Sequence, residues 1–166
     1  MNRDDVPDFL RIIGVLTEHG VDFIVVGGVA ANLLGSARLT YDLDIFYDRK
    51  ETNLSRIVGA LEKINPYLRG APPGLPFKLD LQTLKNGLNF TLTSDLGPID
   101  LLGEIPGARS YEELFADSFE IREQGLIFRC VTLLRLIQLK NAAGRPKDFE
   151  TLAELKTILE ELPDSN

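Results

Sequence analysis

Two aspartates, Asp42 and Asp44, stand one residue apart at the start of the apolar run Leu43 to Tyr47. This run predicts a strand, although acidic residues are depleted in strands. Side chains two residues apart point to the same face of a strand, so both carboxylates project together. Neighbouring carboxylates repel each other unless one binds a proton or a cation lies between them. A divalent cation that prefers oxygen ligands, such as Mg²⁺, would balance the pair.

A third aspartate, Asp100, interrupts another apolar run, Ile99 to Leu102, that also predicts a strand. A charged side chain inside a core strand needs a partner. If this strand lies beside the strand at 43–47, three carboxylates converge. They can then hold two metal ions, which activate a hydroxyl and neutralise a triphosphate during an in-line displacement. The alternative is a structural charge network in which the aspartates pair with Arg38 and Lys140.

A double glycine, Gly27-Gly28, follows the β-branched run at 21–26. Glycine lets a backbone approach a phosphate closely. A helix predicted to start near Val29 offers free N–H groups to the same anion. Gly-Gly alone is a common pair, but Gly-Gly, then Asp-x-Asp and then a strand aspartate form a far more specific combination. Together they predict a site for metal ions and phosphates.

This arrangement resembles the nucleotidyltransferase superfamily that shares the palm fold of DNA polymerase β. More narrowly, the segment 35–44 is similar to a bacterial group with the pattern Gly-x-x-Arg-x-Thr-x-Asp-[Leu/Ile]-Asp. That group includes toxins of abortive-infection and related toxin–antitoxin systems. The matching residues are Gly35, Arg38, Thr40, Asp42, Leu43 and Asp44. The C-terminal segment LIQLKNAAGRPKDFETL is similar to the same group's Lys followed by Arg-x-Lys-Asp.

The resemblance implies an enzyme that moves a nucleoside monophosphate from an NTP, such as ATP, to a hydroxyl and releases pyrophosphate. By this resemblance, Asp42, Asp44 and Asp100 would be the catalytic residues and would bind two Mg²⁺ or Mn²⁺ ions. Asp100 would also be the base that assists the acceptor hydroxyl. Gly27 and Gly28 would contact the phosphates of the NTP.

Arg38, Thr40 and Lys140 complete the predicted nucleotide-binding set. Arg38 would hold a phosphate or orient an aspartate, and the alternative is an ordinary surface ion pair. Lys140 is close in sequence to Arg145 and Lys147. It would neutralise charge on the triphosphate or the leaving pyrophosphate. The alternative is that these cations simply favour a helix C-terminus. Asp148 is interpreted as the N-cap of the last helix.

The sequence leaves the acceptor open among a tRNA end, a protein side chain and a small molecule. We favour a toxin-like bacterial protein that a partner antitoxin neutralises. The second hypothesis is a catalytically inactive module that keeps the fold and binds protein or nucleotide. The oligomeric state is also left open.

Composition narrows these choices. The chain of 166 residues has a formal net charge of −7, and an acidic chain is a poor general binder of nucleic acid. The N-terminus, MNRDDVPDFLRII, lacks the basic region of a signal peptide, and no apolar run is long enough to span a membrane. A single cysteine rules out an intramolecular disulfide. These features predict a cytoplasmic protein without a membrane partner.

Periodicity predicts an α/β (α+β) fold in one domain, 1–166. Its core, 1–130, would hold a mixed sheet because two hairpins exclude a purely parallel one, and 131–166 would form a C-terminal helical pair. The resemblance adds that helices pack mainly on one face. Helices are predicted at 5–19, 54–64, 132–143 and 148–162, and strands at 21–26, 43–47, 88–93, 99–102 and around the turn at 124–125. The Pro- and Gly-rich segment 65–78 is predicted to be a loop over the site.

Overall fold

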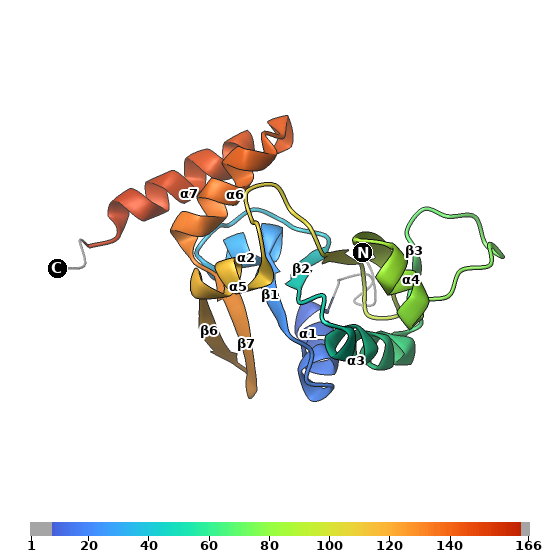
Figure 1. Cartoon of the computed structure of the whole chain (residues 1–166). Helices are drawn as coiled ribbons and strands as arrows, with labels where there is room; N and C mark the ends of the chain where they lie inside the picture. The colour runs from blue at the N-terminus through green and yellow to red at the C-terminus, as the bar shows by residue number, and fades with distance from the viewer. Residues whose placement is uncertain (1–7, 164–166) are drawn as a thin grey trace.

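Short runs of β-branched and aromatic residues form the strands, as their packing on a pleated surface favours. The computed structural model describes residues 8–163, and seven strands in that range form one sheet (Figure 1). The strands are β1 (Phe23–Val26), β2 (Leu43–Tyr47), β3 (Tyr67–Leu68), β4 (Asn89–Thr93), β5 (Ile99–Leu102), β6 (Ser118–Glu123) and β7 (Leu126–Val131). The sheet order is β3-β4-β5-β2-β1-β7-β6.

Helices occupy the segments with a helical apolar period. They are α1 (Phe9–Glu18), α2 (Gly27–Leu33), α3 (Glu51–Leu61), α4 (Leu81–Asn86), α5 (Tyr111–Ala116), α6 (Leu133–Ala143) and α7 (Phe149–Glu161), with 3₁₀ turns at Glu62–Ile64 and Pro146–Asp148. Asp8 caps α1 and Thr132 caps α6, each accepting a hydrogen bond from a backbone N–H three residues on. Residues 5–7 of the predicted first helix lie outside the described range.

The sheet is mixed, as predicted. β2 lies between β1, which is antiparallel to it, and β5, which is parallel to it. Both predicted hairpins are confirmed, because β4 pairs with β5 and β6 pairs with β7 in antiparallel register. The parallel register of β2 and β5 sets Asp44 directly opposite Asp100. The prediction that these two strands are adjacent is therefore confirmed.

Part of the buried core packs against the face of β2 opposite to Asp44. Leu43 and Ile45, which flank Asp44, have no exposed surface. They share one buried cluster with apolar residues of α1 and α3, which lie side by side in Figure 1. The strand period of two thus buries Leu43 and Ile45 and directs Asp44 to the opposite face. This division holds the carboxylate on a rigid strand.

The segment after α3 departs from the prediction. Tyr67 and Leu68 form β3, an edge strand beside β4, inside the stretch predicted as a loop. Helix α4 was not predicted, although Asp80 caps it by accepting a hydrogen bond from Thr83 N at 2.8 Å. Such short elements carry too few residues for a clear period. They matter here because Arg69 follows β3 directly.

Helices α6 and α7 pack on each other and form the predicted C-terminal pair (Figure 1). Helix α6 also contacts α2, which begins at the double glycine. The pair therefore brings its residues to the same side of the sheet as the start of α2. Within 8–163, no helix combines the length and the apolar character that crossing a membrane requires.

Candidate active site

Three carboxylates converge at the centre of the sheet. Asp44 is the second residue of β2, Asp100 is the second residue of β5, and Asp42 directly precedes β2. One carboxylate oxygen from each lies within 4.8 Å of the others, and all three side chains are partly exposed. The strand period and the parallel register of β2 and β5 together produce this cluster. Its donors are hard oxygen atoms, which suit Mg²⁺ or Mn²⁺.

The electrostatics of this cluster favour a bound cation or proton. Burial, together with the charges of the Asp42 and Asp100 carboxylates, raises the pKa of Asp44 to about 7, although Arg145 opposes this change. Burial also raises the pKa of Asp100, although the guanidinium of Arg69 opposes that change. The cluster therefore holds more negative charge than its surroundings balance.

Arg69 is a site residue that the sequence analysis missed. Its Nη2 donates to Asp100 Oδ1 at 2.7 Å, and its Nη1 lies 3.4 Å from Asp42 Oδ2. Its Nε and Nη2 also donate to the carbonyl oxygen of Leu92, which fixes the guanidinium against β4. The only signal in the sequence was the placement of the 65–78 segment over the site. A lone arginine in a Pro- and Gly-rich stretch shows no period that would mark it.

The double glycine lies against the carboxylates. Gly27 has a φ of +67°, and a Cβ built on it would overlap the carboxylate of Asp44. A Cβ on Gly28 would overlap the hydroxyl Oγ1 of Thr40. Glycine is therefore required at both positions, because a side chain at the start of α2 would displace Asp44 or Thr40.

Gly27→Ala is expected to destabilise the protein by about 2–4 kcal/mol, because it combines a left-handed backbone with the overlap on Asp44. Gly144→Ala is the matched control. Gly144 also has a positive φ, of +62°, but a Cβ there would meet no atom closer than 3.9 Å. Urea unfolding of both variants isolates the overlap. If Gly27→Ala costs no more than Gly144→Ala, the Gly27 backbone does not approach Asp44 this closely in solution.

Two cavities meet at the carboxylates. The first, the cationic pocket, has a volume of about 380 Å³ and lies between the start of α2, the segment before β2, and α6 and α7. The predicted site residues that line it are Gly27, Gly28, Arg38, Thr40, Asp42, Asp44, Asp100 and Lys140, and Arg145 and Lys147 line it as well. The second, the apolar pocket, has a volume of about 330 Å³. The structure thus brings every predicted site residue to one cavity.

Arg38 and Thr40 enter the cationic pocket from the segment before β2. Thr40 does not belong to the strand, and its Oγ1 donates to the carbonyl oxygen of Asp42 at 3.3 Å. Arg38 forms an ion pair with Glu150 of α7 at 2.7 Å and a longer one with Glu154. The surface ion pair that was the alternative interpretation of Arg38 is therefore present. Its contact with a phosphate stays a prediction.

Lys140 and Asp148 form a buried ion pair beside the carboxylates. Lys140 Nζ donates to Asp148 Oδ1 at 2.9 Å, and Arg145 Nε donates to Asp148 Oδ2 at 2.7 Å. Asp148 is the N-cap residue of α7, as predicted, but its carboxylate makes no capping hydrogen bond. Both of its oxygens face the two cations instead. Asp148 thereby holds Lys140 and Arg145 at the rim that the two cavities share.

Comparison with known proteins tests this arrangement. A family model described as "Nucleotidyl transferase of unknown function" matches residues 6–58, which include the double glycine and Asp-x-Asp. A protein from Thermotoga maritima assigned as a nucleotidyltransferase superposes with a TM-score of 0.57 at 18% identity, covering 90% of each chain. The chain has the nucleotidyltransferase fold. The predicted α/β class with a C-terminal helical pair is confirmed, and the family match over residues 6–58 supports the predicted superfamily.

Two further nucleotidyltransferase structures share this fold. The lincosamide antibiotic adenylyltransferase LnuA, with lincomycin bound, has a TM-score of 0.59 and 16% identity, over 93% of this chain and 99% of its own. The aminoglycoside-modifying protein ANT(2″)-Ia, in complex with adenylyl-2″-tobramycin, has a TM-score of 0.57 and 16% identity, over 91% and 87%. A search of curated proteins by sequence gave no match.

Proposed function

We propose that this protein is a metal-dependent nucleotidyltransferase that moves a nucleoside monophosphate from an NTP to a hydroxyl acceptor. The observation that carries the proposal is the convergence of Asp42, Asp44 and Asp100 within 4.8 Å, against the side-chain-free backbone of Gly27. A structural charge network would need matching cations. Arg69 is the only cation paired with these carboxylates among residues 8–163, and it contacts only two of them.

The donor set fits divalent ions. Asp42, Asp44 and Asp100 would hold two Mg²⁺ or Mn²⁺ ions, because three carboxylates at this spacing offer the oxygen ligands that these ions prefer. When bound, such ions neutralise the triphosphate and increase the acidity of a coordinated hydroxyl. Arg69 supplies part of the same positive charge to Asp42 and Asp100 through its ion pairs.

The chain's own residues would bind and orient the reactants. The backbone of Gly27 and Gly28 would lie along the phosphates, where no side chain intervenes. Lys140 and Arg145 would face the pyrophosphate and balance its charge as it leaves. Arg38 and Thr40 would also contact the phosphates, from the segment before β2.

Asp100 would accept the proton of the acceptor hydroxyl on a carboxylate oxygen. The acceptor oxygen then forms a bond to the α-phosphorus, and the bond from that phosphorus to the bridging oxygen of the β-phosphate breaks. The products are the nucleotidylated acceptor and pyrophosphate, and the proton stays with Asp100 until solvent removes it.

A small-molecule acceptor is supported by LnuA and ANT(2″)-Ia, whose structures contain lincomycin and adenylyl-tobramycin. The toxin-like role rests on the pattern from Gly35 to Asp44. It predicts that induced expression slows bacterial growth, that Asp42→Asn/Asp44→Asn relieves the effect, and that a partner antitoxin also relieves it. A tRNA end and a protein side chain are the other acceptors that the transfer experiment distinguishes.

The proposal predicts labelled transfer that requires a divalent ion. Each α-labelled NTP is incubated with the protein, Mg²⁺ or Mn²⁺, and separated metabolite, tRNA and protein fractions. We expect label in one fraction and release of pyrophosphate, both lost with chelator and in Asp42→Asn/Asp44→Asn. Binding of NTP without transfer to any fraction would instead support the inactive nucleotide-binding module. Growth inhibition that the double variant retains would contradict a catalytic toxin.

A further inference from the structure

The apolar pocket adjoins the cationic pocket at Asp44 and Asp100. It shares Gly27, Asp44, Asp100, Lys140 and Arg145 with the cationic pocket. The rest of its lining is mainly apolar and comes from the sheet, the segment after β5, and α6; it includes Val26, Leu102, Ile105, Leu136, Leu139 and Ala143. Nothing in the proposed phosphate site accounts for this apolar surface.

The size and charge of the apolar pocket limit its ligand. A volume of about 330 Å³ lies at the lower end of small-molecule sites. Its three acidic residues, Asp44, Asp100 and Glu104, outnumber its two basic ones, so the pocket is a poor site for a nucleic-acid backbone. Glu104 is the one acid of the lining that the cationic pocket does not share, and it forms no ion pair within residues 8–163.

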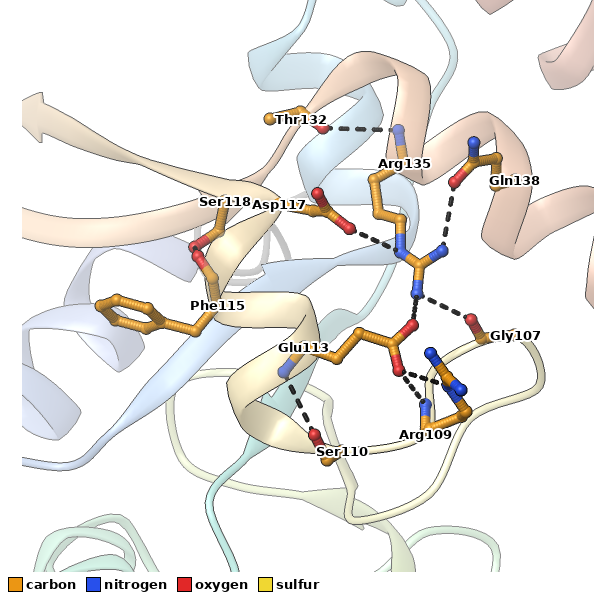
Figure 2. Close-up of polar contacts among 10 residues, drawn as sticks. All are labelled: Gly107, Arg109, Ser110, Glu113, Phe115, Asp117, Ser118, Thr132, Arg135 and Gln138. Carbon is orange, nitrogen blue, oxygen red and sulfur yellow. Dashed lines mark hydrogen bonds and ion pairs between the residues drawn. The ribbon is translucent and has the colours of Figure 1, made fainter.

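The wall of the apolar pocket that follows β5 is preformed by contacts within the protein. The segment after β5 turns back toward α6 at Gly107, where a Cβ would lie 2.9 Å from the Cβ of Ala142. Figure 2 shows Arg135 of α6 between this turn and α5. Arg135 Nη2 donates to Gly107 O at 2.8 Å and to Glu113 Oε1 at 2.6 Å.

The same carboxylate holds the turn from its other end. Glu113 Oε2 accepts hydrogen bonds from the backbone N and the Nε of Arg109 (Figure 2). Arg135 is nearly buried, with 13% of its side chain exposed, so this ion pair is poorly screened by solvent. The turn that carries Glu104 and Ile105 is therefore held by α6 at Gly107 and by Glu113 of α5 at Arg109. A pocket with fixed walls loses little entropy when a ligand binds.

We propose that the apolar pocket is the acceptor site, and that it takes a small molecule with a hydroxyl, an apolar body and a protonated amine. The proposal rests on the function proposed above. The hydroxyl would face Asp100, the apolar body would cover Leu136 and Leu139, and the amine would pair with Glu104. The acceptor oxygen then meets the α-phosphorus where the two pockets join.

Ligand-observed NMR tests the proposal with a set of amino alcohols that carry aromatic or alicyclic bodies. Their N-acetyl analogues keep the shape and remove the charge. Ala143→Phe fills the pocket from α6, and Ala153→Phe, on an exposed position of α7 that lines neither pocket, is the matched control. Glu104→Gln removes the charge opposite the amine. A fluorescent ATP analogue with Mg²⁺ measures the cationic pocket separately in every variant.

We expect Ala143→Phe to weaken amino-alcohol binding about tenfold or more, and Ala153→Phe to leave it unchanged. Glu104→Gln should weaken amino-alcohol binding by no more than about fivefold, because Glu104 is exposed, and should leave the uncharged N-acetyl analogues unaffected. Nucleotide binding should persist in all three variants. Equal amino-alcohol binding in Ala143→Phe and wild type would overturn the acceptor site, as would label transfer to RNA or protein alone. If the wild type does not bind the nucleotide at all, the proposed function is overturned instead.

Discussion

Replacing Asp44 by asparagine is expected to lower nucleotide transfer by about 10³-fold and, at the same time, to stabilise the metal-free protein near about pH 8. Activity falls because the central carboxylate of the cluster is lost. Stability rises because the same carboxylate is held in an unfavourable environment, where burial and two neighbouring carboxylates raise its pKa to about 7. A residue kept for packing would show the opposite effect on stability.

The sign of the pH dependence follows from proton binding. The unfolded chain releases the proton of Asp44 near the ordinary value of 3.8, whereas the folded protein keeps it up to about 7. Between these values the folded state binds more protons, so stability decreases as the pH rises. The full cost, at most about 4 kcal/mol, is present above about pH 7. Below about pH 4 both states are protonated and the advantage of Asp44→Asn should disappear.

Chemical unfolding of wild type and Asp44→Asn in chelator, at several pH values, measures this difference. Glu123→Gln, at the exposed end of β6, is the control for the loss of one negative charge. Addition of Mg²⁺ should stabilise the wild type more than Asp44→Asn, because the ion removes the repulsion that the substitution removes. A variant that is less stable than the wild type at every pH would contradict the electrostatic account of the cluster.

The carboxylate cluster could be predicted because its geometry follows from short-range rules. The strand period places Asp42 and Asp44 on one side, and the apolar neighbours of Asp100 mark a second core strand. Only the neighbouring of β2 and β5 had to be assumed, and the structure confirms it. The double glycine was predictable for a related reason, because a strand-to-helix turn next to charged groups leaves no room for a side chain.

The cations around the cluster could not be assigned in the same way. Arg69 reaches Asp100 from 31 positions away in sequence, through an edge strand of two residues that shows no period. Asp148 has the position of a helix cap, and local rules favour that interpretation. The packing of α6 on α7 brings Lys140 within 2.9 Å of it, and a buried ammonium competes for a carboxylate more strongly than a backbone N–H. Tertiary contacts therefore decide the roles of these residues.

Asp148→Asn is expected to destabilise the protein by about 3–5 kcal/mol near neutral pH, because it leaves the ammonium of Lys140 buried without its partner. Both side chains of this pair are only 7% exposed. Burial alone would raise the pKa of Asp148, but hydrogen bonds from Lys140 and Arg145 outweigh burial and hold the pKa below its ordinary value. The ion pair therefore stabilises the fold above the ordinary pKa of an aspartate, and this contribution is lost as the pH falls through the lowered value.

Urea unfolding at several pH values tests this prediction, with Glu112→Gln as the matched control. Glu112 pairs with Lys50 at 3.8 Å, but both side chains are more than two-thirds exposed, so its loss should cost less than about 1 kcal/mol. The gap between Asp148→Asn and wild type should narrow below about pH 4, where the wild-type carboxylate also becomes neutral. A cost no larger than that of Glu112→Gln would show that Lys140 finds another partner or reaches water. In that case Asp148 would not be the residue that holds Lys140 beside the carboxylates. Asp148→Asn would then bind phosphate groups through Lys140 as well as the wild type does.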